Sequence, residues 1–277
     1  MKFLSKIYMF IIFALLYAPI VVLVVFSFNE SGSLSEFTNI TFDWYIELFN
    51  DETAFMALKN SLILAVCSAL AATVIGTFAA LGLYHMRRRY IKNAIKSVTN
   101  IPMVNPDIVT GVSLMLLFVA VFGLLENKFG IKLHMGFGTM LIAHTTFNLP
   151  YVLLSVMPRF NQLDRSLSEA AMDLGCTPTR AFFLVELPQI IPGIISGVML
   201  AFTMSLDDFV ISHFVSSPNF QTLPLYVYNQ TAHNVKFSMY ALCALIVAII
   251  LAILLIVNFA GSINNYKKTR PVKGVSR

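Results

Sequence analysis

The stretch Glu169-Ala170-Ala171-Met172-Asp173-Leu174-Gly175, followed by Val185-Glu186-Leu187-Pro188, lies in a polar insert between two long apolar segments. A chain needs no such insert merely to cross a lipid bilayer. It needs one where a soluble protein has to bind it from the inner side of the membrane. The insert therefore predicts a contact surface for a soluble partner.

Local residues predict the shape of this insert. Ser166 and Glu169 fit a capping box, in which the serine hydroxyl accepts from a free amide at a helix start and the glutamate reaches back. Gly175 can adopt the left-handed conformation that ends the helix. Thr177-Pro178 then supplies an N-cap and a first helical residue, and Pro188 stops the second helix. We therefore expect two short helices joined by a turn.

The composition of the whole chain is that of a membrane protein. Of its 277 residues, 57% are hydrophobic and 12% are charged, and the mean hydropathy is +0.77; a soluble domain carries about 25% charged residues. The three cysteines have no pair spacing that suggests a metal or redox site. No polar stretch is long enough for a separate core, and no phosphate-loop, H-E-x-x-H or G-x-S-x-G motif occurs. We therefore expect no enzymatic activity, and no cofactor or metal bound by this chain.

Charged residues delimit six apolar segments, each long enough to cross about 30 Å of hydrocarbon. These segments are 7–28, the stretch between Lys59 and Arg87, 105–125, 133–157, 189–215 and 238–263. The first is too long for a signal peptide and lacks a small-residue cleavage pattern, so we expect an uncleaved anchor. The predicted fold class is an all-α polytopic membrane protein with six transmembrane helices.

The distribution of Lys and Arg predicts the orientation, because cytoplasmic loops carry the positive excess. With the N-terminus inside, fifteen of these residues fall on the inner side and four on the outer side. Both termini are therefore expected in the cytoplasm. The basic balance reflects topology and contact with the lipid bilayer, and no nucleic acid is expected as a partner.

Two further patterns concern packing. The row Ser61, Ala65, Ala69, Thr73 and Thr77, and the GxxxG motif of Gly193 and Gly197, place small residues where helices approach closely in lipid. In the first outer loop, residues 42–49 predict a short amphipathic helix that carries the only tryptophan, Trp44. Anchoring at the membrane interface is the default role of such a residue, and contact with a ligand is the alternative.

The insert resembles the signature loop of ABC importer permeases: E-A-A, three residues, G, nine residues, an aliphatic residue, one residue and L-P. Val185 stands where isoleucine is more usual. The resemblance implies the type I permease fold, with this loop as a coupling helix that docks on a cytosolic ATPase. The residues implied for that docking are Glu169, Ala170, Ala171, Gly175, Leu187 and Pro188.

Shorter motifs along the chain resemble the spermidine/putrescine permease subunits of this superfamily. They are Asn105–Val109, Met204–Val210, Ser217–Phe220, Leu223–Tyr226, Phe37-Thr38 and Trp44-Tyr45. The resemblance implies polyamine import by alternating access. It also implies as partners a homologous permease subunit, two cytosolic ATPase subunits, which would hold ATP and Mg, and an extracytoplasmic substrate-binding protein. The expected domains are a first helix with its outer loop (1–58), a permease core (59–265, coupling loop about 158–188) and a basic tail (266–277).

Asp107, Asp207 and Asp208 are the acids expected at or near hydrocarbon depth. A carboxylate there costs about 2.5–3.5 kcal/mol on insertion scales and usually faces a cavity. A polyamine path requires separated carboxylates and aromatic faces, so the candidate substrate pathway comprises these acids with Trp44 and Tyr45. Asp107 could instead serve only the first turn of a helix, and at least one of Asp207 and Asp208 is expected to line the path. His144 and His213 are expected to pack rather than bind metal.

Three alternatives stay open at this point. The first is a permease of the same superfamily for another solute, such as ferric ion, thiamine or an opine. The second is a secondary transporter, which predicts inverted repeats that the sequence does not show. The third is a membrane scaffold, which explains the capped insert but leaves the intramembrane acids without a role.

Overall fold

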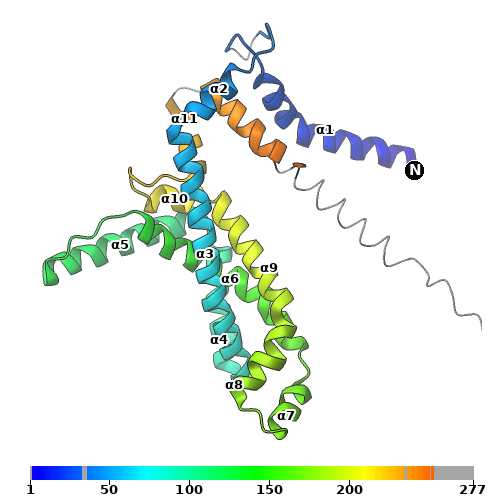
Figure 1. The fold of residues 1–277 in the computed structure, drawn as a ribbon, viewed down its shortest axis with the longest axis vertical. Coiled ribbons are helices and arrows are strands. Elements are labelled where there is room, and N and C mark those ends of the chain that lie inside the picture. Colours follow the sequence, from blue (N-terminus) through cyan, green and yellow to red (C-terminus); the bar gives the residue numbers. More distant parts are fainter. Residues whose placement is uncertain (1, 33–35, 234–235, 250, 253–277) are drawn as a thin grey trace, which may run out of the picture. The chain divides into compact units, whose positions relative to one another are not determined.

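The structure is a computed structural model that describes residues 2–32, 36–233, 236–249 and 251–252, and helices dominate it (Figure 1). In chain order the helices are α1 (Lys2–Phe26), α2 (Asp43–Asn50), α3 (Glu52–His85), α4 (Arg89–Val104), α5 (Asp107–Phe129), α6 (Phe137–Gln162), α7 (Arg165–Asp173), α8 (Pro178–Ala181), the π-helical turn η1 (Phe182–Glu186), α9 (Leu187–Asp207), α10 (Val210–Val215) and α11 (Leu223–His233). The described residues form two compact units, one up to Glu52 together with those from Asn229 onward, and one from Thr53 to Tyr228.

Five helices in the described part of the chain are long and apolar enough to cross a membrane. They are Ser5–Phe26, Glu52–His85, Asp107–Phe129, Phe137–Gln162 and Pro178–Asp207, and they correspond to the first five predicted segments. The sixth predicted segment, 238–263, begins as a shorter apolar helix, Phe237–Ile249, and continues beyond the described residues. The prediction of an all-α polytopic membrane protein is confirmed.

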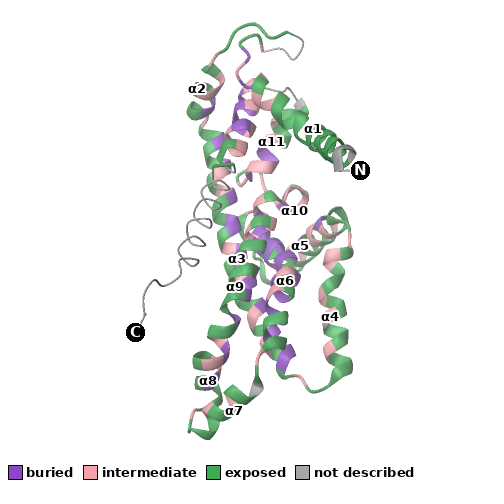
Figure 2. Ribbon diagram, turned by 90° about the vertical axis from the view of Figure 1, so that its right-hand side faces the viewer, coloured by how far each residue is buried: buried purple, intermediate pink, exposed green. Residues whose placement is uncertain are grey.

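The main core of the larger unit lies where α6 packs against α9 and α3. Its buried members include Ala69 and Ala72 of α3, Val152 and Phe160 of α6, and Ile190 of α9. Figure 2 shows buried residues concentrated on these helices, whereas α1 is exposed from Ser5 to Val22. The small-residue row predicted on α3 is therefore a packing face, since apolar side chains from α6 fill the space that small residues leave open.

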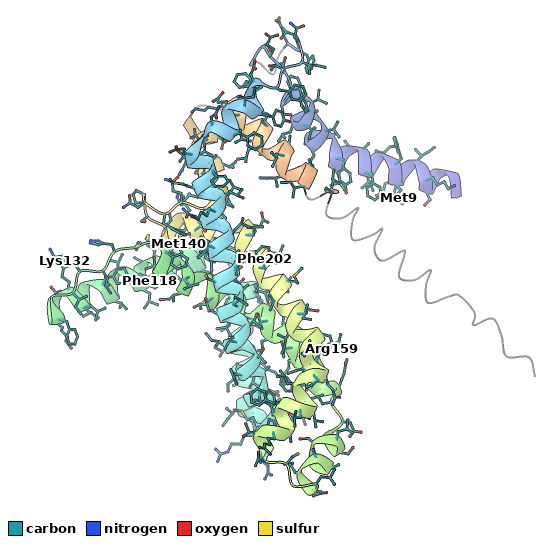
Figure 3. All side chains as sticks on the ribbon, viewed as in Figure 1. Met9, Phe118, Lys132, Met140, Arg159 and Phe202 are labelled. Carbon is teal, nitrogen blue, oxygen red and sulfur yellow. The ribbon has the colours of Figure 1, made fainter. Side chains whose placement is uncertain are left out.

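The predicted GxxxG motif marks the closest approach in this core. A Cβ atom on Gly193 would lie 2.6 Å from Cγ of Arg159 and 3.0 Å from the carbonyl oxygen of Ser155, both on α6. A Cβ atom on Gly197 would lie 3.4 Å from Cγ1 of Val152. The two glycines therefore let α9 lie directly against the α6 backbone, close to the Arg159 side chain labelled in Figure 3.

We expect Gly193→Val to lower the melting temperature of the purified permease, because the added carbons have to push α6 away. Overpacking of this kind costs about 1–3 kcal/mol. Gly123→Val is the matched control: Gly123 lies within α5, and an added Cβ atom there meets nothing within 4 Å. Thermal unfolding followed by size-exclusion chromatography measures both variants. Equal melting temperatures for the two would contradict this account of the α6–α9 contact.

A second apolar cluster joins α5, α6 and α10. It is formed by the buried residues Phe118, Ala143, Phe147, Ile211 and Val215. Phe118 lies on α5 and is labelled with the α6 residue Met140 in Figure 3. This cluster fixes α10, a helix too short to be stable by itself, beside two membrane-spanning helices.

Helix α4 was not predicted, although its sequence carries the signal. Ile95, Thr99 and Pro102 of α4 line an apolar pocket of about 430 Å³ together with residues of α3 and α6. Lys92 and Lys96 are not among the residues that line it. The apolar positions recur at helical spacing, but the basic residues from Arg87 onward were interpreted only as a sign of orientation.

Candidate coupling loop and intramembrane polar residues

The first helix of the predicted loop, α7, begins two residues earlier than expected. Its N-cap is Asp164, whose Oδ1 accepts a 3.0 Å hydrogen bond from the backbone N–H of Ser166. Hydrogen bonds from the side chain and backbone of Ser166 hold the pKa of the Asp164 carboxyl below its ordinary value. The predicted capping box of Ser166 and Glu169 is therefore wrong, because the preceding carboxylate caps the positive end of the helix first.

The turn at Gly175 is confirmed. Gly175 has φ +91°, the left-handed region that favours glycine. Its backbone N–H donates to Met172 O at 2.9 Å, and that of Cys176 donates to Ala171 O at 3.1 Å, so the last carbonyls of α7 are satisfied. Thr177 then caps α8 by accepting a 3.4 Å bond from Arg180 N, with Pro178 in the first turn, also as predicted.

Pro188 does not stop the second helix, which corrects another prediction. The chain widens upstream into η1, where the N–H of Leu187 donates to Phe182 O, and it then continues as α9. Pro188 cannot donate to the carbonyl four residues earlier, and its ring would collide with that carbonyl. The wide turn accommodates the proline within one continuous helix. Leu187 and Pro188 thus belong to the base of a membrane-spanning helix.

The tip of the loop is exposed. Glu169 and Ala170 are exposed on α7, Ala171 is half-buried, and Leu174 is 88% exposed. Leu167 and Met172 of α7 are exposed as well, and exposed apolar side chains that cluster in this way mark a candidate contact surface for another protein. The predicted coupling residues from Glu169 to Gly175 thus lie together on one protruding turn (Figure 1).

The predicted fifth span is interrupted at one of the candidate pathway acids. Helix α9 ends at Asp207, and α10 starts at Val210, whereas the sequence had predicted one span over 189–215. The Asp208 carboxylate accepts from the backbone N–H groups of Ile211 (3.2 Å) and Ser212 (2.8 Å). It therefore caps the first amides of α10, and this explains why the break falls here.

Asp208 also belongs to a buried set of polar side chains that we call the histidine network: Ser68, His144, Ser205, Asp208 and Ser212. His144 Nδ1 lies 2.7 Å from Ser205 Oγ, which accepts from Ser68 Oγ at 2.9 Å. His144 Nε2 lies 3.2 Å from Ser212 Oγ and 3.4 Å from Asp208 Oδ2. The Asp208 side chain is only 7% exposed, and the histidine network as a whole connects α3, α6, α9 and α10.

The other two candidate acids are exposed. Asp207 is the last residue of α9, and its carboxylate makes no hydrogen bond or ion pair with any described residue. Asp107 is the first residue of α5, where a carboxylate is favoured by the helix dipole. The structure does not bring these two acids together with Asp208 into a single site, but it leaves both available to a solute or a partner.

The two aromatic candidates lie in the smaller unit, on α2, whose predicted position is confirmed. Trp44 Nε1 donates to Asn29 O at 2.8 Å, and its ring lies 5.6 Å from that of Phe237. The Tyr45 hydroxyl lies 2.8 Å from Ser27 Oγ. Both side chains therefore fasten α2 to neighbouring segments of the same unit.

Comparison with known proteins identifies the family. Residues 72–263 match the family described as binding-protein-dependent transport system inner membrane component. The chain belongs to this family. The permease is thus a multi-pass membrane component of a transport system rather than an enzyme, and the predicted ABC importer permease is confirmed.

Relatives cover most of the chain. The permease is 43% identical over 234 residues to the putrescine transport system permease protein PotI of Escherichia coli K12, which covers 84% of this chain and 82% of PotI. It is 36% identical over 264 residues to the spermidine/putrescine transport system permease protein PotC of Haemophilus influenzae, with coverage of 95% and 98%.

Solved structures show the same fold at low sequence identity. A bacterial ABC transporter involved in the import of the acidic polysaccharide alginate contains a chain that matches with a TM-score of 0.74 at 17% identity, over 97% of this chain and 96% of that one. A chain of the MetNI methionine ABC transporter matches with a TM-score of 0.56 at 19% identity, over 83% and 100%. The type I importer fold predicted from the loop therefore agrees with these neighbours.

Proposed function

We propose that the permease is the transmembrane subunit of an ATP-driven importer that carries polyamines, spermidine or putrescine, into the cell. The observation that supports this most is its similarity to two permeases named for these solutes, one of them over 95% of the chain. The exposed carboxylates Asp107 and Asp207 suit such a cargo, because a polyamine presents several ammonium groups along a methylene chain.

The loop geometry supports a partnership with soluble ATPases. The complex would contain a second, PotB-like permease, two PotA-like ATPase subunits that hold ATP and Mg, and a PotD-like extracytoplasmic binding protein. The α7 tip, with Glu169 and Ala170 exposed, would dock on an ATPase. Because η1 and α9 continue from this loop without interruption, a displacement of the loop would be transmitted to a membrane-spanning helix. That connection supports alternating access driven by ATP.

The orientation follows from charge and from the loop. The excess of Lys and Arg on the side of the loop supports a cytoplasmic position for both termini. A loop that docks on a cytosolic ATPase has to face the same side. We therefore place the α7–η1 end of the permease in the cytoplasm of a bacterial cell.

Competition for uptake tests the cargo. Vesicles that contain the assembled transporter should take up labelled putrescine, and unlabelled spermidine should compete whereas thiamine and ferric ion should not. Asp207→Asn should lower uptake about tenfold or more, since a charged hydrogen bond contributes about 1.5–3 kcal/mol, without lowering the amount of assembled permease. Glu126→Gln is the matched control, because Glu126 is an exposed carboxylate 3.8 Å from Lys132 Nζ. The proposal would be overturned if the vesicles took up thiamine or ferric ion and if excess polyamine did not reduce that uptake.

A further inference from the structure

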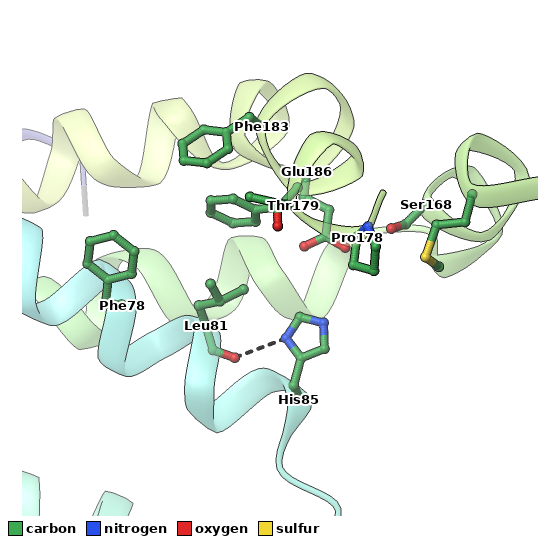
Figure 4. A pocket seen from close by; sticks show the side chains of 10 residues that line it. Phe78, Leu81, His85, Ser168, Pro178, Thr179, Phe183 and Glu186 are labelled. Atoms are coloured by element: carbon green, nitrogen blue, oxygen red, sulfur yellow. Dashed lines mark hydrogen bonds between the residues drawn. The ribbon is translucent and has the colours of Figure 1, made fainter. Parts of the chain in front are cut away.

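A pocket of about 560 Å³ opens between the end of α3 and the coupling loop (Figure 4). Phe78, Leu81 and His85 of α3 form one wall, and Phe182, Phe183 and Glu186 of η1 form another. Ser168 and Thr179, from the two sides of the Gly175 turn, complete the rim. All of these residues belong to the larger unit. None of them is a candidate residue of the substrate pathway.

Glu186 is the unusual member of this pocket. The residue is only 8% exposed, and its Oε2 atom is buried without a hydrogen-bond partner among the described residues. Leaving a buried acceptor unsatisfied costs about 1–3 kcal/mol, and more for a charged group. In Figure 4 the carboxylate lies between the α3 residues Leu81 and His85 and the loop residues Ser168 and Pro178. A donor inside the pocket would remove this cost.

The backbone positions Glu186 for this role. Glu186 ends the π-helical turn η1, which also supplies Phe182 and Phe183 to the same pocket. Such wide turns are rare and are frequently found at functional sites. The turn that accommodates Pro188 thus also places one carboxylate and two aromatic rings around a single cavity.

The side-chain oxygen atoms that line the pocket, on Glu186, Ser168 and Thr179, can all accept hydrogen bonds. His85 Nδ1 lies 3.2 Å from Leu81 O; a carbonyl cannot donate, so Nδ1 carries the hydrogen and is already engaged with this carbonyl. Ser168 and Thr179 add hydroxyl groups, and neither Lys nor Arg lines the pocket. Because the Glu186 carboxylate would repel an anion and no basic side chain in the lining would offset this, the pocket disfavours the binding of anionic ligands. A ligand that suits this lining carries positive charge, several N–H donors and an apolar body.

We propose that this pocket binds a small primary amine, with its ammonium group on Glu186 and its methylene chain against Phe78, Phe182 and Phe183. Aromatic faces attract cations, with about 0.5–2 kcal/mol per contact. A metal ion fits less well, because one carboxylate and one imidazole are too few ligands. The described residues also hold no group of three or more His, Cys, Asp or Glu side chains that could bind a metal. The inference goes beyond the proposed transport function, because the pocket chemistry alone defines the ligand class.

The test uses the complete permease–ATPase complex in nanodiscs, without nucleotide and without the binding protein. A photoreactive putrescine analogue should label peptides from residues 178–186, and excess putrescine should displace it whereas 1,4-butanediol should not. Glu186→Gln should weaken this labelling about tenfold or more, as expected for loss of a charged hydrogen bond. Phe78→Leu, which leaves every charge in place, should weaken it about threefold. Asp173→Asn, an exposed carboxylate on the same loop, should leave it unchanged.

Three results would overturn the proposal. One is labelling that Glu186→Gln and Phe78→Leu both leave unchanged. Another is displacement by butanediol as effective as that by putrescine, which would show an apolar pocket only. The last is a cross-link between Glu186 and a lysine of the ATPase, with no labelling by the analogue, which would show that the partner fills the pocket. The uptake competition tests the transported solute, and the labelling experiment tests this pocket. The two proposals can therefore fail independently, because an importer of another solute could still bind an amine in this pocket.

Discussion

Replacing Gly175 with proline is expected to abolish uptake by the assembled transporter while the chain still inserts into the membrane. Gly175 has φ +91°, and its N–H donates to Met172 O. Proline fixes φ near −65° and has no N–H, so the turn between α7 and α8 has to rearrange. The α7 tip would then no longer present Glu169 and Ala170 in the geometry that the proposed docking on an ATPase requires. A movement of the ATPase would then no longer be transmitted through the loop to α9.

The measurement compares uptake, ATP hydrolysis and the amount of permease in the membrane. Gly130→Pro is a matched control, because Gly130 also has a positive φ of +67° and donates its N–H, to Glu126 O, at the far end of α5. We expect at least a tenfold loss of uptake for Gly175→Pro and little change for Gly130→Pro. Ala170→Arg should reproduce the loss with the backbone intact, since a bulky charge replaces a small exposed contact. Unchanged uptake in both loop variants would remove the coupling assignment.

Local sequence patterns predicted the loop well because its geometry is set within a few residues. The left-handed glycine and the Thr177-Pro178 start each depend only on near neighbours. The two errors arose where two local rules competed. Asp164 and Ser166 are both good N-caps, and the carboxylate is the one used. Pro188 favours a stop, but packing of α9 against α6 stabilises a continuous helix, and η1 absorbs the proline.

The polar interior could not be predicted in the same way. His144 and Ser205 are 61 residues apart, and Ser68 and Ser205 are 137 residues apart. No spacing rule connects such positions; only the packing of α3, α6, α9 and α10 brings them together. The same holds for Glu186, which sequence reasoning treated as a spacer within the signature loop. Asp207 and Asp208 did carry a local signal for a new helix start, since aspartate is a preferred N-cap. The apolar residues that follow them suggested one continuous span, so the break between α9 and α10 was not predicted.

The second large effect is expected from His144→Leu. His144 is 1% exposed on α6, and its ring joins Ser205 of α9 to Ser212 and Asp208 at the start of α10. Leucine fills similar space but donates nothing, so the Asp208 carboxylate stays buried without its imidazole partner. Leaving buried polar groups without a hydrogen-bond partner costs about 1–3 kcal/mol, and more where the group is charged. We therefore expect a marked fall in melting temperature and in the amount of folded permease.

A double-mutant cycle with Asp208→Asn separates the pair from general damage to the core. Asparagine is also a good N-cap, but it carries no charge, so in that background His144→Leu no longer removes a contact between the imidazole and a carboxylate. The double variant should therefore lose clearly less stability than the sum of the two single losses, by about 1–3 kcal/mol of coupling. Phe147→Leu, on the same helix and also buried, is the control, and its loss should add to that of Asp208→Asn. Strict additivity for His144→Leu would mean that the imidazole only fills space. Coupling would mean that the contact between His144 and Asp208 itself stabilises the junction between α9 and α10.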